Sequence, residues 1–151
     1  MVAGRRPAAD EVRNVAYVRQ VVDVDRLRDE VREKYREVAQ DPSAEYHFHT
    51  GRAHAHRLGY SAWPLDELPE YACEAFAGVG NPFHWGGPQQ GERVVDLGSG
   101  AGMDSLLAAR WIGAEGFVIG VDMTPEMLER SRSTANRLGL ANFEWRDQPG
   151  A

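Results

Sequence analysis

The stretch that most constrains the fold is Arg93–Gly102, which reads RVVDLGSGAG. Its first half is mostly apolar and predicts a short buried strand. A helical run begins directly after the stretch, and three glycines separate strand from helix at alternate positions: Gly98, Gly100 and Gly102. Glycine lacks a Cβ and lets a ligand approach the backbone, and a helix N-terminus offers free N–H groups and a partial positive charge. The stretch therefore predicts a strand–loop–helix unit that binds a nucleotide or nucleoside cofactor.

The pattern stays regular beyond this loop. Residues 103–112 predict a helix, residues 117–121 an apolar strand that closes on Asp122, and residues 143–145 a third strand. Between the last two strands, Thr124 is a good N-cap and Pro125 suits the first helical position, so a helix is expected to run to Leu138. The order β-α-β-α-β predicts an α/β fold with a parallel, doubly wound, Rossmann-like sheet.

The preceding part of the chain predicts helices and loops. Residues 1–19 are expected to be flexible, and apolar residues spaced by three and four predict an amphipathic helix over residues 21–39 that covers another layer. A short helix is expected over residues 65–78. The glycines between 86 and 91 indicate a boundary between this N-terminal helical part and the part that follows. The predicted organisation is a flexible terminus (1–19), a helical and loop segment (20–90) and a partial cofactor-binding domain (91–151).

Residues 45–63 hold four of the five histidines of the chain: His47, His49, His54 and His56. Imidazole pairs can bind a metal, but no cysteine or carboxylate cluster completes such a site here. Thr50, Gly51 and Arg52, between the two pairs, predict a turn. A packing or substrate-facing role is favoured, and no metal site is assigned.

Composition narrows the class of partner. The net charge of −6 over 151 residues argues against a general nucleic-acid binder, which would carry a basic surface. No apolar run approaches the roughly 18 residues that a membrane span needs. The expectation is a cytoplasmic protein that binds neither nucleic acid nor membrane.

Asp122 narrows the choice of cofactor. The carboxyl ends of neighbouring parallel strands meet at one edge of the sheet, where an acid can accept both hydroxyls of a ribose held by the glycine loop. The dinucleotide fingerprint G-x-G-x-x-G would need glycine at position 103, where this chain has Met103. A dinucleotide oxidoreductase is therefore disfavoured.

Two longer runs carry a family resemblance: VVDLGSGAGMD from Val94 and VIGVDMTPEM from Val118. With the Gly78–Pro82 turn and Phe48–Gly51, they resemble the class I S-adenosylmethionine-dependent methyltransferases, most closely the arsenite methyltransferase family. The resemblance runs from the mid-forties to the end. It implies a glycine loop against the methionine part of the cofactor, with the ribose on the second-strand acid and the adenine against the next residue. The implied cofactor-binding residues are Asp96, Gly98, Ser99, Gly100, Gly102, Asp104, Asp122 and Met123; no catalytic residue is assigned.

The sequence departs from this family in two places. The family has a cysteine where this chain has Val79, and a thiophilic arsenic centre is best held by several thiolates, so the methyl acceptor is left open. Family members have seven strands, whereas three are expected here, as in a truncated N-terminal half whose open first strand could bind a partner or a second copy. The expected function is methyl transfer to a small molecule; the alternative is a non-catalytic cofactor-binding fragment or an interaction module.

Overall fold

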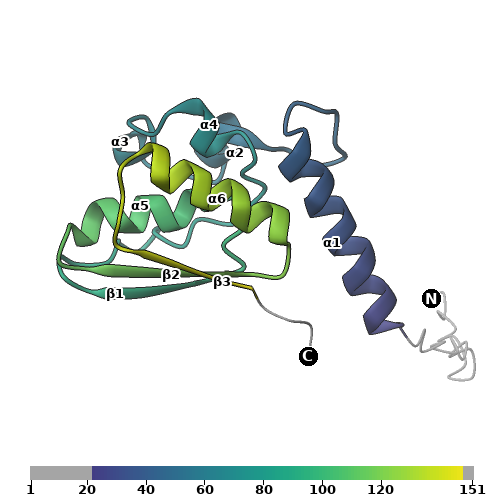
Figure 1. Cartoon of the computed structure of the whole chain (residues 1–151). Helices are drawn as coiled ribbons and strands as arrows, with labels where there is room; N and C mark the ends of the chain where they lie inside the picture. Colours follow the sequence, from purple (N-terminus) through teal and green to yellow (C-terminus); the bar gives the residue numbers. More distant parts are fainter. Residues whose placement is uncertain (1–21, 148–151) are drawn as a thin grey trace, which may run out of the picture.

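The computed structural model describes residues 22–147 in three layers (Figure 1). A parallel sheet forms one outer layer, two helices lie on it, and short helices from the N-terminal half cover those two. The segment 1–19, expected to be flexible, lies outside the described residues.

The sheet consists of β1 (Arg93–Leu97), β2 (Phe117–Asp122) and β3 (Phe143–Asp147) in the order β1-β2-β3. Both pairings are parallel; Leu97 lies beside Val121, and Val121 lies beside Arg146. The predicted α/β sheet is confirmed. The register also brings the carboxyl ends of β1 and β2 together, which places the glycine loop next to Asp122.

Helices α5 (Met103–Ile112) and α6 (Pro125–Arg137) both pack on the same face of the sheet. Most of their buried side chains are apolar, among them Leu106 and Leu128. Within residues 22–147, no element covers the opposite face. There β1 exposes 58% of Val95 and 77% of Leu97.

The outer helical layer differs from the predicted pattern. Residues 65–78 do not form one helix: α3 (Ala62–Leu65) and α4 (Glu70–Cys73) are single turns. The turn predicted at residues 50–52 is wrong as well, since α2 (Gly51–Arg57) begins there. Long-range contacts decide both cases: the Gly51 amide donates to the Phe76 carbonyl at 2.8 Å, and the Arg52 guanidinium donates to the Leu65 and Leu68 carbonyls.

Helix α1 (Val24–Gln40) confirms the predicted amphipathic helix, but only its C-terminal end packs. Val38 is fully buried, whereas Val24 and Leu27 are exposed. Arg130 of α6 fixes this end, because its guanidinium donates to the Ala39 carbonyl at 2.9 Å and pairs with Glu74. No helix in the described part of the chain is long and apolar enough to cross a membrane.

Candidate cofactor-binding site

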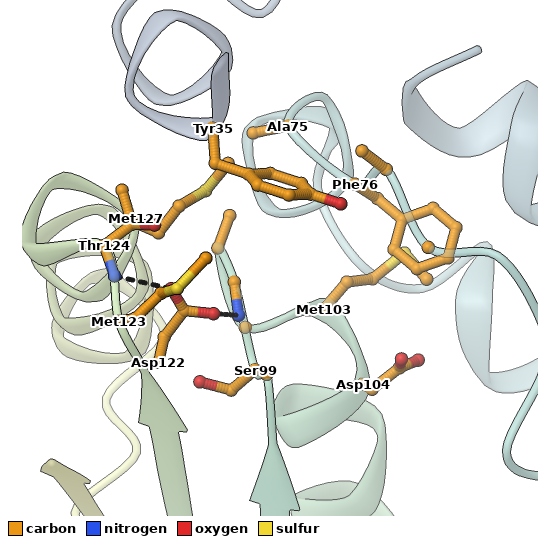
Figure 2. A pocket seen from close by; sticks show the side chains of 16 residues that line it. Tyr35, Ala75, Phe76, Ser99, Met103, Asp104, Asp122, Met123, Thr124 and Met127 are labelled. Atoms are coloured by element: carbon orange, nitrogen blue, oxygen red, sulfur yellow. Dashed lines mark hydrogen bonds between the residues drawn. The ribbon is translucent and has the colours of Figure 1, made fainter. Parts of the chain in front are cut away.

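A cavity of about 280 Å³ opens at the carboxyl ends of β1 and β2. The glycine loop forms its floor, residues 122–124 and Met127 form one wall, and Tyr35 of α1 with residues 75–78 form the other side. Figure 2 shows the Tyr35 ring reaching over the cavity from α1, with Asp122 and Ser99 below it in that view. The cavity therefore joins the sheet edge to the N-terminal helical layer.

Asp122 is anchored at the end of β2 by two backbone amides. Its Oδ2 accepts from the Gly100 N–H and its Oδ1 from the Thr124 N–H, both at 2.8 Å. The side chain is only 9% exposed but lines the cavity. Each carboxylate oxygen can accept a further hydrogen bond, so this acid can still receive a vicinal diol.

The glycine loop lies directly beside this acid. Gly100 has φ of +52° and Gly102 has φ of +88°, which L side chains rarely adopt. A Cβ at Gly100 would point into open space, whereas one at Gly102 would lie 1.9 Å from Ser131 Oγ. One glycine thus leaves room for a ligand, and the other lets α6 pack against the loop.

Seven of the eight predicted cofactor residues line this cavity: Gly98, Ser99, Gly100, Gly102, Asp104, Asp122 and Met123. The eighth, Asp96, lies half-buried in β1, where it accepts a 2.6 Å hydrogen bond from the Ser105 hydroxyl. This bond ties β1 to the first turn of α5. Burial raises the pKa of the Asp96 carboxyl above its ordinary value.

Asp104 lies in the first turn of α5 and at the cavity wall. Its Oδ1 accepts a 2.7 Å hydrogen bond from the Tyr60 hydroxyl. Burial, reinforced by the charge of Asp96, raises the pKa of Asp104 to about 7, although the Tyr60 hydrogen bond opposes the shift. This carboxyl therefore changes charge near neutral pH.

The raised pKa predicts that Asp104→Asn stabilises the protein in alkaline solution. A carboxyl with a higher pKa in the folded state than in the unfolded state loses stabilising free energy as the pH rises from about 4 to 7. The amide side chain introduced by this substitution does not ionise, so it causes no such loss of stability, and its oxygen can still accept the hydrogen bond from the Tyr60 hydroxyl. We expect Asp104→Asn to raise the free energy of unfolding by about 1–3 kcal/mol at pH 8 and to leave it unchanged near pH 4. Urea unfolding at the two pH values measures the difference, and an equal effect at both would contradict this origin.

Two hydroxyls at the site have no partner among the described residues. Ser99 Oγ and Thr124 Oγ1 are buried, and both residues line the cavity. Thr124 occupies the N-cap position of α6 as predicted, but its side chain makes no capping hydrogen bond. Unpaired buried hydroxyls cost free energy, so both are suited to a ligand that supplies the missing partner.

The charged side chains of the described cavity wall are all acidic. Among the described residues that line it are two carboxylates, Asp104 and Asp122, and no lysine, arginine or histidine. The remaining wall is largely apolar, and several of its members were missed in the sequence analysis: Tyr35, Phe76, Met103 and Met127. This combination suits a ligand with a positive charge, a diol and an apolar ring.

The histidines and the cysteine serve other contacts. His54 Nε2 bonds the Gly78 carbonyl at 2.8 Å, and His56 Nε2 bonds Asp66 at 3.0 Å. Residues 22–147 contain no group of three or more histidine, cysteine or acidic side chains that could hold a metal. Cys73 is buried in the core, and burial raises the pKa of its thiol to about 11.

Sequence comparison agrees with this geometry. Residues 88–149 match the methyltransferase domain family. The matched segment contains all three strands, the glycine loop and Asp122, so the resemblance expected from the motifs is confirmed. The chain resembles methyltransferases over the part that builds the sheet edge of the cavity.

Individual proteins to which the chain is similar include methyltransferases with different acceptors. An arsenite methyltransferase of Halobacterium salinarum is 44% identical over 90 residues, which are 60% of this chain and 23% of that protein. A 23S rRNA (uracil(1939)-C(5))-methyltransferase of Acinetobacter baumannii is 45% identical over 60 residues, 40% of this chain and 13% of that protein. The chain thus spans less than a quarter of either relative. An arsenic(III) S-adenosylmethionine methyltransferase of Chlamydomonas reinhardtii superimposes with a TM-score of 0.43 at 31% identity, covering 67% of this chain and 33% of that one.

Proposed function

We propose that the cavity binds S-adenosylmethionine and that the chain belongs to a methyltransferase acting on a small molecule. The observation that carries this proposal is Asp122, held by the Gly100 and Thr124 amides beside a glycine loop at the ends of two parallel strands. An acid in this position is suited to the two hydroxyls of a ribose.

The charge of the wall favours this cofactor over a dinucleotide. S-adenosylmethionine carries a sulfonium and an ammonium group, whereas a dinucleotide carries a pyrophosphate that Asp104 and Asp122 would repel. Ribose would bind Asp122, adenine would lie against Met123, and the methionine part would lie along the glycine loop. The family resemblance implies this orientation, and the cavity has matching groups on each side.

The bound cofactor would supply an activated methyl group, and the residues of the chain would hold and orient it. The cavity wall has apolar side chains on the Tyr35 and Phe76 side that would exclude water from the sulfonium. We assign no general base to the reaction.

The methyl acceptor is proposed to be a small molecule, with arsenite unassigned. Val79, at the position where the family has cysteine, is 97% exposed and offers no thiolate. The thiol of Cys73 is buried and protonated at neutral pH, and one thiol cannot chelate arsenic. A cytoplasmic location, without nucleic-acid or membrane partners, is part of the same proposal.

Calorimetry with S-adenosylmethionine and, separately, NADH tests the cofactor. Saturable binding of the first and none of the second supports the proposal, and no binding of S-adenosylmethionine at millimolar concentration would overturn it. Transfer of a labelled methyl group to arsenite or another small acceptor then separates an enzyme from the alternative, a fragment that binds the cofactor without turning it over.

The open edge of the sheet leads to a prediction about association. Within residues 22–147, β1 pairs with β2 on one side and with no strand on the other, and its bare face exposes Leu97. Such edges pair readily with further strands, so we expect concentration-dependent association that Leu97→Lys weakens. Sedimentation velocity at rising concentration measures it. A wild-type protein that stays monomeric throughout would rule out this surface.

A further inference from the structure

Tyr60 connects the N-terminal helical layer to the cavity. It lies just after α2, is 6% exposed, and its ring contacts Phe76 and Phe83 edge-on, with centroids 5.5 and 6.3 Å away. These contacts fix the direction of the hydroxyl. That hydroxyl has two acceptors within reach, Asp104 Oδ1 at 2.7 Å and the Gly80 carbonyl at 3.2 Å.

A tyrosine hydroxyl has one proton and can make only one of these two bonds well. When Asp104 is ionised, the shorter bond to its carboxylate is favoured, because hydrogen bonds to charged acceptors are the stronger ones. When Asp104 is protonated, its own O–H can donate to the tyrosine oxygen. The hydroxyl proton of Tyr60 is then free for the Gly80 carbonyl.

The second acceptor lies in a turn that reaches the cavity. Gly78, two residues before Gly80, lines the cavity, and its carbonyl bonds His54 Nε2 at 2.8 Å. A change of partner at Gly80 would therefore tighten the turn beside the ligand. It would do so in the state in which Asp104 has lost its charge.

The charged surroundings of Asp104 favour a cationic ligand. Asp96 on β1 acts on it through space, Asp122 on β2 acts on Asp96, and Tyr60 is its hydrogen-bond donor. Among the described residues of the cavity wall there is no basic side chain to neutralise these acids. Of the two cations of S-adenosylmethionine, only the ammonium group of the methionine part has N–H groups that can donate hydrogen bonds to the Asp104 carboxylate.

We propose that Tyr60 is a positioning residue that holds the Asp104 carboxylate for the ammonium group of the cofactor, and that its hydroxyl turns to the Gly80 carbonyl when Asp104 takes up a proton. The inference rests on the proposed binding of S-adenosylmethionine and deepens it. It predicts that cofactor affinity follows the charge of Asp104 across neutral pH, through a residue that does not itself line the cavity.

The test is a pH series of calorimetric titrations with S-adenosylmethionine on four proteins: wild type, Tyr60→Phe, Asp104→Asn and the double variant. The wild-type affinity should fall about tenfold from pH 8 to pH 6, because Asp104 loses its charge in this range. Tyr60→Phe removes the hydrogen bond that favours the ionised form, so its midpoint should move up by about one pH unit. At pH 9, where Asp104 is ionised in both proteins, Tyr60→Phe should bind nearly as well as wild type.

Asp104→Asn serves as the matched control. It should bind more weakly than wild type at pH 8 with little dependence on pH, and Tyr60→Phe should add no further loss in its background. An equal loss from Tyr60→Phe in both backgrounds would show that Tyr60 acts only through packing, and an unchanged pH profile in Tyr60→Phe would likewise overturn the inference. If Tyr60→Phe fails to fold, a pH-dependent affinity in Asp104→Asn overturns it, and a flat one supports it. If the wild-type protein binds no cofactor at any pH, the proposed function is wrong. If binding is lost in Asp122→Ala but is unchanged by Tyr60→Phe, only this inference is wrong.

Discussion

Asp122→Ala should weaken the binding of S-adenosylmethionine by roughly 100-fold, which corresponds to about 2.7 kcal/mol. The substitution removes the carboxylate proposed to accept both ribose hydroxyls. It also leaves the Gly100 and Thr124 amides, each 2.8 Å from that carboxylate, without their acceptor. The glycine loop, which is proposed to hold the methionine part, therefore loses its anchor together with the proposed ribose contact.

The control for Asp122→Ala is Asp29→Ala, which removes an acid from the exposed surface of α1. Its side chain is 76% exposed and, among residues 22–147, has an ion pair with Arg32, one turn along the helix. Both variants lose one negative charge, so a nonspecific effect of net charge would appear in both. Calorimetry at pH 8 should show near wild-type affinity for Asp29→Ala. An Asp122→Ala protein that binds as tightly as wild type would show that the ribose lies elsewhere.

Gly102→Ala should destabilise the fold by about 3 kcal/mol or more, the second large effect expected for this chain. Its φ of +88° strains any side chain, and the new Cβ would lie 1.9 Å from Ser131 Oγ and 3.3 Å from the Trp145 ring. The Ser131 hydroxyl would have to rotate away, and the Ser131 Cβ at 3.0 Å and the Trp145 ring would still press on the new methyl group, between the helix that follows the loop and the helix that carries Ser131. Because both helices share the core, the loss should appear in the global unfolding transition.

Gly100→Ala is the matched comparison for this effect. It introduces the same methyl group at φ of +52°, but no atom lies within 4 Å of the new Cβ. Only backbone strain of about 1–2 kcal/mol is expected there, together with weaker cofactor binding. Urea unfolding followed by circular dichroism separates the two variants, and Ser131→Ala should partly rescue Gly102→Ala. Equal destabilisation by the two alanines would contradict the close packing at Gly102.

The part of the site at the sheet edge was predictable from the sequence because the motifs that form it lie close together along the chain. A strand, its loop and the next helix follow one another within residues 93–112, and Asp122 ends the very next strand. Parallel pairing then brings the two strand ends together without any further information. The predicted cofactor residues on the loop and at Asp122 consequently line one cavity.

The wall of the site that comes from the N-terminal helical layer has no comparable motif in the sequence. Tyr35 was predicted only as part of an apolar helix face, and Tyr60 meets Asp104 across a separation of 44 residues. The start of α2 depends on a hydrogen bond from Gly51 to Phe76, and the path of residues 65–68 depends on Arg52. Such contacts form between distant segments, so spacing and propensity within one segment cannot predict them.

The acidic cavity wall leads to an expectation about which adenosine compounds would be rejected. ATP has the same ribose diol and the same adenine, so the roles proposed for Asp122 and Met123 would not distinguish it from S-adenosylmethionine. Discrimination falls on the tail: a triphosphate would be placed beside Asp104 with no basic side chain in the described wall to receive it. The free N–H groups at the start of α5 would attract an anion, and the two carboxylates oppose that attraction. In the proposed binding mode, selectivity against a triphosphate would thus come from repulsion by the acidic wall, in addition to the contact between Asp104 and the ammonium group.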